Sequence, residues 1–246
     1  MKNRSIGRAL MRALSCASTW MSTWAPTAGQ GRKLLLTTGS IALIASMAAG
    51  CASAPDRYYT LVSAMDAATL PPVAAVPAGA PLLYVELAPI DLPERLARPQ
   101  LVVRRQDAGS SARIDILEQH RWTSSFENEL RDALASGIAS RLGAIDATKG
   151  SKSAGQPVWR IGVHVRQFDA VENSRVDADF GWTLKRSDRE RGVTCRWTVS
   201  EPVGAASGID GVAQAVQRVS AKAAEAIGQD VRAQERNAGA VCGPGI

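Results

Sequence analysis

The chain has 246 residues, of which 29 are Lys or Arg and 23 are Asp or Glu, and its formal net charge is +6. The excess positive charge lies within residues 1–50, which hold six basic residues and no acidic one. Without this segment the balance is 23 against 23, and no basic run with interleaved aromatic residues is left. The composition therefore argues against nucleic-acid binding and links the high isoelectric point to targeting.

Residues 1–50 have the three parts of a secretory signal. A basic first part precedes an apolar core from Leu34 to Ala49, which at about 16 residues is shorter than a transmembrane helix requires. Small residues fill the three positions before Cys51, as a signal peptidase requires, and the Cys51 thiolate is the nucleophile that accepts a diacylglyceryl group. The pattern looks like a bacterial lipobox. It predicts a lipoprotein signal peptide over 1–50 and lipid attachment at Cys51, with an uncleaved membrane anchor or a chance cysteine as the alternative.

The remaining 196 residues (246 minus 50) are enough for one domain with a substantial core. Residues 51–81 are predicted to be a lipidated tether with a short first strand at 57–62 and an Ala/Pro-rich linker. Residues 82–235 are predicted to form a single α+β domain. Residues 236–246 are predicted to be a Gly-rich C-terminal tail.

The predicted strands fall into two groups. The first comprises 82–87, 101–105 and 113–118, the last two joined by a turn at 107–110. The second shows period-2 alternation, which indicates an antiparallel meander with one wet face. Its runs are 159–166, 176–185 and 193–199, and their inward positions include Trp159, Trp182 and Trp197, which we expect in the core.

Two amphipathic helices are predicted from apolar residues at helical spacing. The first extends over 126–142, with Ser124 and Glu127 at capping-box spacing and Gly143 as its C-cap. The second begins near Asp210, its predicted N-cap. Together the elements predict an α+β fold, a two-layer sandwich of a mainly antiparallel sheet covered on one face by the two helices.

The four cysteines have separate roles. Cys16 leaves with the leader, and Cys51 is the acylated residue. Cys195 and Cys242 remain in an oxidising compartment, where a disulfide persists. Cys195 alternates with the core face of its strand, and Cys242 lies in a tail that could fold back to reach it. Two alternatives stay open, namely a Cys195–Cys242 disulfide, or a buried free thiol with a loose tail.

The mature sequence has no pattern that indicates catalysis or metal binding. His120 and His164 lack a neighbouring ligand at metal spacing, and His164 alternates outward as a solvated residue. There is no nucleophile elbow and no phosphate loop. Asp177 and Asp179 share a strand face, where we expect a solubilising pattern rather than an acid–base pair. We therefore expect no enzyme activity, no catalytic residue, no metal and no cofactor.

Four short segments follow Cys51 in a specific order. A Tyr-x-Leu strand at 58–61 comes first, and a strand that runs into a proline loop follows at 85–93. An Arg-Pro-Gln stretch lies at 98–104, and an Arg-Trp pair at 121–122 precedes the long helix. In this order the segments resemble the PqiC-type family of ABC-transport auxiliary lipoproteins.

The resemblance implies a non-enzymatic, lipid-anchored accessory subunit of an ABC/MCE-type system that carries lipids between the membranes of Gram-negative cells. It further implies MCE-domain or ABC-transporter components as partners, and assembly as homo-oligomers or symmetric rings. Ala52 follows the cysteine in place of the Asp that retains lipoproteins at the inner membrane. We therefore expect the outer membrane, facing the periplasm.

A partner is expected to dock on the proline-rich loop from residue 89 to 100, because its prolines reduce the entropy lost on binding. The candidate residues are Pro89, Pro93, Arg95, Arg98, Pro99 and Gln100. The alternative is that this loop only turns the chain between two strands. The second candidate function is a lipid- or lipopolysaccharide-binding carrier with its ligand in a cavity between sheet and helices.

Overall fold

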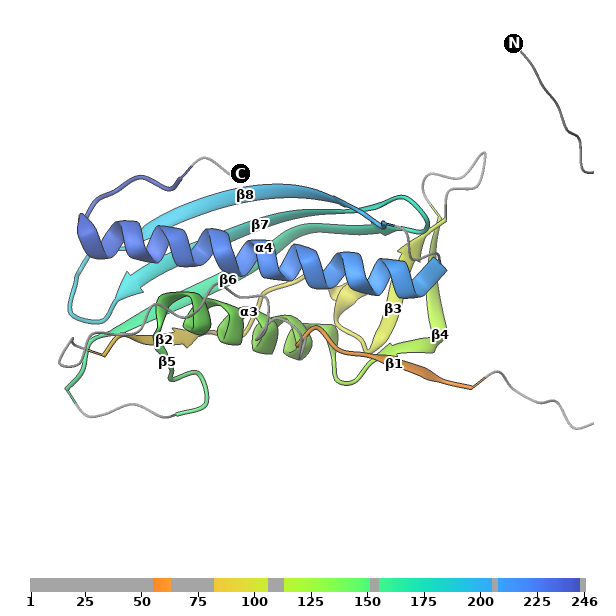
Figure 1. Cartoon of the computed structure of the whole chain (residues 1–246), viewed down its shortest axis with the longest axis horizontal. Helices are drawn as coiled ribbons and strands as arrows, with labels where there is room; N and C mark the ends of the chain where they lie inside the picture. The colour runs from red at the N-terminus through yellow and green to blue at the C-terminus, as the bar shows by residue number, and fades with distance from the viewer. Residues whose placement is uncertain (1–54, 63–81, 106–112, 151–154, 205–207, 244–246) are drawn as a thin grey trace, which may run out of the picture. The chain divides into compact units, whose positions relative to one another are not determined.

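The computed structural model describes residues 55–62, 82–105, 113–150, 155–204 and 208–243 (Figure 1). All of them belong to the second of two compact units of the chain, residues 54–246. Cys51, the leader, most of the Ala/Pro-rich linker and the predicted turn at 107–110 lie outside the described residues.

The described residues form one eight-stranded sheet and two α-helices, so the fold is α+β, as the sequence predicts. The helices lie side by side on one face of the sheet (Figure 1). The strands are β1 (Arg57–Tyr59), β2 (Tyr84–Leu87), β3 (Gln100–Arg104), β4 (Ile114–Trp122), β5 (Ile145–Asp146), β6 (Val158–Val171), β7 (Arg175–Arg186) and β8 (Val193–Pro202). The helices are α3 (Phe126–Leu142), α4 (Gly208–Arg236) and a short 3-10 helix, η1 (Glu94–Leu96).

The sheet is built on β6, its longest strand. One edge of β6 pairs antiparallel with β7, which pairs antiparallel with β8, so the predicted meander is confirmed. The other edge pairs in parallel with β2 near its start and with β3 at Val171. β4 pairs antiparallel with β3 and parallel with β1. β2 also pairs in parallel with β5.

The core lies between the sheet and the two helices. Trp159, Trp182 and Trp197 are buried there, which confirms their predicted position. The inward face of α4 carries the predicted apolar stripe, fully buried, with Val212, Val216, Val219, Ala223, Ile227 and Val231. Burying an aliphatic side chain of this size contributes about 1.5–3 kcal/mol, so the stripe alone is a large part of the driving force for docking α4. Within the described part of the chain, no helix is both long and apolar enough to cross a membrane.

Gly143 is the C-cap of α3, as predicted, but the predicted starts of both helices are wrong by one or two residues. Ser125, rather than Ser124, is the N-cap of α3, and its side chain accepts a hydrogen bond from the Asn128 backbone N–H at 3.3 Å. α4 begins at Gly208, before Asp210, and the Gly208 N–H donates to the side chain of Asn173 at 2.9 Å. This partner comes from the turn between β6 and β7, so no local pattern could have identified it.

Four strands, β4, β6, β7 and β8, extend beyond their predicted bounds, whereas β1 and β2 are shorter than the predicted strands at 57–62 and 82–87. β4 runs to Trp122, four residues past the predicted end at residue 118. It continues this far because its last three residues pair with β1, and Arg121 also pairs with the first residue of β3. Trp122 therefore ends a strand, with the three residues Thr123 to Ser125 between it and α3. β5 has two residues and was not predicted, since it forms a strand by pairing with the distant β2.

Candidate anchoring and docking sites

The segment that follows the predicted lipid-attachment position, Cys51, is fixed to the domain through Tyr59. The Tyr59 hydroxyl donates to Asp210 Oδ1 at 2.7 Å and lies 2.8 Å from His120 Nδ1. Because the Tyr59 hydroxyl donates its one proton to Asp210, its oxygen accepts a hydrogen bond from the Nδ1–H of His120. Burial, then the hydrogen bond to Asp210, raise the pKa of Tyr59 to about 12. The hydroxyl therefore stays protonated, and it joins β1, β4 and α4.

A second contact fixes the end of the same segment. Glu129, buried in the first turn of α3, accepts hydrogen bonds from the Leu61 backbone N–H and the Thr60 hydroxyl, each at 2.9 Å. It also accepts from the hydroxyls of Thr123 and Ser124. Burial acts to raise the pKa of Glu129, but the four hydrogen bonds together hold it below its usual value. The carboxylate is therefore ionised and joins the N-terminal segment to α3.

Hydrogen bonds and buried side chains hold the proline-rich loop against the domain along its length. Asp91 N–H donates to Val163 O at 3.1 Å, and Val165 N–H donates to Asp91 O at 2.7 Å, so this part of the loop lies against β6. Arg95 is exposed, and its guanidinium donates to Phe168 O at 3.3 Å. Two side chains of the loop, Ile90 and Leu96, are buried in the core.

The C-terminal half of the loop is held by β4 and α3. Pro99 O accepts from Trp122 N–H at 2.7 Å, and the Gln100 side chain donates to Glu118 at 3.2 Å. Arg98 is half-buried, and its Nε is a buried donor without a hydrogen-bond partner among the described residues. Pro89 and Pro99 are exposed, and Pro93 is half-buried. The candidate docking residues thus form an ordered surface, on which Pro89, Arg95 and Pro99 face solvent.

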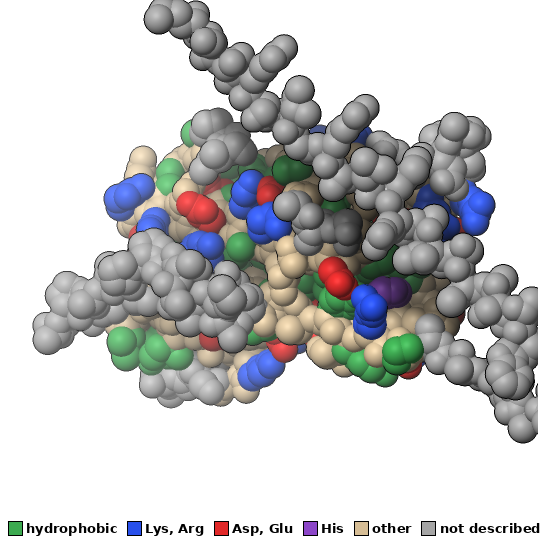
Figure 2. Space-filling model, turned by 45° about the vertical axis from the view of Figure 1, so that its right-hand side comes forward, with side chains coloured by type: hydrophobic (Ala, Val, Ile, Leu, Met, Phe, Trp, Pro, Cys, Tyr) green, Lys and Arg blue, Asp and Glu red, His purple; other side chains and the backbone are tan. Residues whose placement is uncertain are grey.

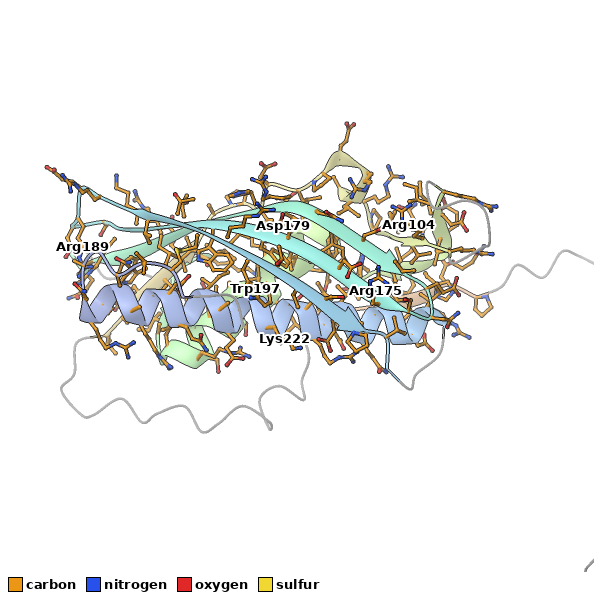
Figure 3. The ribbon with its side chains drawn as sticks, turned by 90° about the horizontal axis from the view of Figure 1, so that it is seen from above. Arg104, Arg175, Asp179, Arg189, Trp197 and Lys222 are labelled. Atoms are coloured by element: carbon orange, nitrogen blue, oxygen red, sulfur yellow. A yellow bond between two sulfur atoms is a disulfide. The ribbon has the colours of Figure 1, made fainter. Side chains whose placement is uncertain are left out.

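The outer face of the sheet, turned away from α4, carries an open groove of about 370 Å³. Asp179 lies in this groove, whereas Trp197 is on the side toward α4 (Figure 3). Arg196 binds Asp179 through two hydrogen bonds, of 3.0 and 2.6 Å, and lowers the pKa of this carboxyl. Asp177 accepts from Arg175 at 2.8 Å and from Ser200 at 2.6 Å.

These contacts correct the sequence interpretation of the two aspartates. Asp179 is 9% exposed and bound by an arginine, so it is a structural residue rather than part of a solubilising pattern. Asp177 is half-buried. Each carboxylate is engaged by cationic or hydroxyl donors, Asp179 by Arg196 and Arg166, and Asp177 by Arg175 and Ser200.

His164 alternates onto the outer face, as predicted, but it is half-buried rather than fully solvated. Its ring occupies the space over Gly181, where an added Cβ would overlap Nε2. Glycine at position 181 thus makes room for the imidazole. His120 contacts Tyr59 by stacking as well as by its hydrogen bond.

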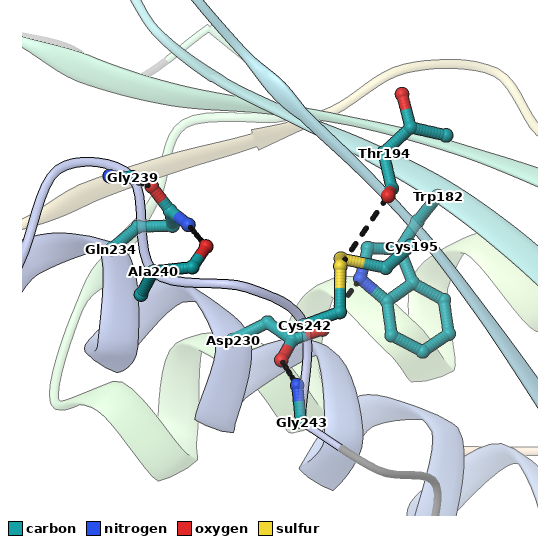
Figure 4. The surroundings of a disulfide bond; sticks show 9 residues. All are labelled: Trp182, Thr194, Cys195, Asp230, Gln234, Gly239, Ala240, Cys242 and Gly243. Atoms are coloured by element: carbon teal, nitrogen blue, oxygen red, sulfur yellow. Dashed lines mark hydrogen bonds between the residues drawn. A yellow bond between two sulfur atoms is a disulfide. The ribbon is translucent and has the colours of Figure 1, made fainter.

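In the structure, Cys195 and Cys242 form a disulfide, with their Cα atoms 5.6 Å apart (Figure 4). Asp230 of α4 lies beside it, is buried, and accepts from Trp182 Nε1 at 3.1 Å and from the Gly243 N–H at 3.0 Å. Among the described residues, the two sulfurs and an Asp230 oxygen form the one set of three possible metal ligands that lie close together. The two sulfurs are bonded to each other, so they are not free thiolates. The tail therefore folds back across α4 to β8.

A small cavity lies where α4 meets β3, β4 and the second half of β6. It is lined by apolar side chains that include Phe126, Phe168, Val212 and Val216. Its volume is about 20 Å³, close to the space that one water molecule needs. Small-molecule sites measure roughly 300–1,000 Å³. This cavity has no room for an acyl chain.

The fold is an α+β sandwich in which the N-terminal segment is joined to the sheet and to both helices. The sequence model for the ABC-type transport auxiliary lipoprotein component matches residues 59–228, and the chain belongs to this family. The match begins at the last residue of β1 and ends within α4, so it includes α3, the first part of α4 and the sheet apart from the first two residues of β1.

One solved structure, described as the crystal structure of an uncharacterized protein, shares the fold at 16% identity, with a TM-score of 0.53 and with 72% of this chain and 99% of that chain covered. Protein XCC0632 from Xanthomonas campestris, of the DUF330 family, has 14% identity and a TM-score of 0.49, with 65% and 91% covered. Among curated proteins, none matches the chain.

Proposed function

We propose that this protein is a non-enzymatic, lipid-anchored accessory subunit of an ABC/MCE-type intermembrane lipid transport system. Residues 1–50 are removed, and the mature protein begins at Cys51, whose acyl chains hold it on the periplasmic side of the outer membrane. The family match supports the transport role. The observation that carries the proposal is the fixed attachment of residues 57–61 to β4, α3 and α4, since a tethered adaptor needs its anchor joined firmly to the folded domain.

The partner surface in this proposal is the proline-rich loop. Its exposed residues are presented on a backbone that the core and β6 already hold in place, so binding would order few additional residues. The proposed partner is an MCE-domain component, and the subunit acts as a homo-oligomer. The carrier alternative places its ligand between the sheet and the helices, and among the described residues the cavity at α4 accommodates about one water.

Two experiments test the proposal separately. For the anchor, cells are grown with labelled palmitate and the protein is compared with Cys51→Ser. Label in the wild type alone, with the precursor accumulating in the variant, is expected. Equal labelling, or membrane retention of a normally processed variant, would overturn the anchor.

For the docking loop, Arg95→Glu is compared with Arg191→Glu in co-purification with the MCE-domain protein of the same organism. Arg191 is an exposed arginine in the β7–β8 turn and serves as the matched control. We expect recovery to fall for Arg95→Glu alone, with the thermal unfolding of both variants unchanged. Equal recovery from both variants would rule out the loop, and lipid that co-purifies in native mass spectrometry would favour the carrier.

A further inference from the structure

An apolar stripe crosses the outer face of the sheet at the end that holds β1, β3 and β4. Tyr58 is 61% exposed, Ile116 is 41% exposed and Ile114 is 39% exposed. Figure 2 turns this end of the domain toward the viewer and shows apolar side chains at the surface between charged ones. Large exposed apolar side chains gathered on one surface indicate an interaction site, whereas single ones are ordinary.

Strand register places these residues on one face. Tyr58 pairs with Arg121 and Gln100 also pairs with Arg121, and paired residues on neighbouring strands point to the same side. Along β3, Val102 and Arg104 alternate onto the side of Gln100, and they pair with Ile116 and Ile114. The intervening β3 residues, Leu101 and Val103, point to the core and are 1% exposed.

The chain between Cys51 and β1 is short. Arg57, the first residue of β1, lies six positions after Cys51. At roughly 3.3–3.6 Å per residue, a fully extended segment reaches about 20 Å. The domain is longer than this reach, because the 29 residues of α4 alone extend over about 44 Å. Acyl chains on Cys51 would therefore keep the β1 end of the domain near the lipid headgroups.

One arginine, Arg121, lies on the same face, because it pairs with Tyr58. Its side chain is 34% exposed and faces Glu118 at 3.4 Å. Arg57 and Arg113 alternate onto the other face, where they pair with Asp210 and Asp115. The stripe therefore has little net charge, and apolar insertion suits it better than electrostatic attraction alone.

We infer that Tyr58, Ile114 and Ile116 form a membrane-contacting surface, which inserts into the interfacial layer of the bilayer that holds the Cys51 acyl chains. Tyrosine suits this depth, because its ring is apolar and its hydroxyl is polar. The inference rests on the proposed lipid anchor and adds an orientation. The outer face of β1, β3 and β4 meets lipid, and the β7–β8 turn points away from it.

The test uses the full lipidated protein in vesicles of phosphatidylethanolamine and phosphatidylglycerol. An environment-sensitive fluorophore is attached to Ile116→Cys or, as the matched control, to Arg191→Cys in the β7–β8 turn. The introduced cysteine is the reactive one, because Cys195 and Cys242 are bonded and Cys51 is acylated in this proposal. Emission is then recorded with and without lipids spin-labelled near the headgroup.

At position 116 we expect the fluorophore emission to shift to the blue and to be quenched by spin-labelled lipid. At position 191 we expect neither effect. Adding Tyr58→Asp and Ile114→Asp should abolish both effects at position 116. Equal quenching at both positions, or none at 116, would overturn the surface. A blue shift at 116 that depends on protein concentration or on an added partner protein, and not on lipid, would also overturn it. Vesicle flotation is measured first, since a protein that fails to float contradicts the lipid anchor rather than the orientation.

Discussion

The backbone N–H of Leu61 donates a hydrogen bond of 2.9 Å to Glu129 Oε2, across 68 positions of the sequence. Glu129 lies in the first turn of α3, where the helix dipole favours a negative charge. The same carboxylate accepts from three hydroxyls, so a single buried anion organises the strand end, the β4–α3 connection and the helix start. This contact determines how the chain that leads to the membrane joins the core.

Replacing Glu129 with Gln is expected to destabilise the protein by about 1–3 kcal/mol, since the amide cannot satisfy the four donors that the carboxylate satisfies. Urea unfolding measures this loss. Glu127→Gln, which removes the same charge from the same helical turn, is the control and should change stability by less than about 0.5 kcal/mol. Equal losses in the two variants would show that charge at the helix start, rather than the contact with Leu61, is what matters.

Acid should destabilise the fold. Burial acts to raise the pKa of Glu201, but hydrogen bonds from Lys222 at 2.5 Å and Arg218 at 2.6 Å lower it. The pKa values of Glu129 and Asp179 are also lowered. A lowered pKa in the folded state gives stability that is present above the unfolded value, about 4.3 for Glu and 3.9 for Asp, and lost as pH falls through the folded value. Unfolding free energy should therefore drop below about pH 4, and less steeply in Glu201→Gln than in the wild type. A profile that is flat from neutral pH down to about pH 3 contradicts this.

Loss of the disulfide should destabilise the protein by about 2–4 kcal/mol, because the bond closes a loop with a sequence separation of 47. The double variant Cys195→Ala, Cys242→Ala is compared with the wild type with and without dithiothreitol. Reductant should lower the stability of the wild type and leave that of the double variant unchanged. Mass spectrometry of non-reduced peptides from periplasmic protein should detect the linked pair, and two free thiols there would contradict the bond.

Gly181→Ala should destabilise the protein by about 1–3 kcal/mol, since the new methyl group collides with the His164 ring. Adding His164→Ala should recover most of that loss, because it removes the atoms in the way. A double-mutant cycle from thermal unfolding measures the coupling. Additive losses would show that backbone conformation, rather than the space under the imidazole, explains glycine at this position.

Local pattern was sufficient for the elements whose side chains repeat at a regular period. Period-2 alternation predicted β6, β7 and β8 and the burial of Trp182, because a strand with one buried face imposes that alternation on its own sequence. Apolar spacing predicted α3 and α4 in the same way. The residues before Cys51 indicate a lipobox for a similar reason, since a peptidase reads a short extended segment by its local chemistry.

Tertiary structure decided everything that depends on a partner far along the chain. The two residues of β5 become a strand only beside β2, and the Asn173 side chain satisfies the first N–H of α4 from another turn. The pattern predicted Asp179 as a surface carboxylate, but the pairing of β7 with β8 brings Arg196, two positions from the residue opposite it, into a hydrogen bond with it. Sequence periodicity is a property of one element and its solvent, so it determined which faces are buried. A hydrogen bond joins two elements, and only the packing of the whole domain decides which pairs meet, as it does for Leu61 and Glu129.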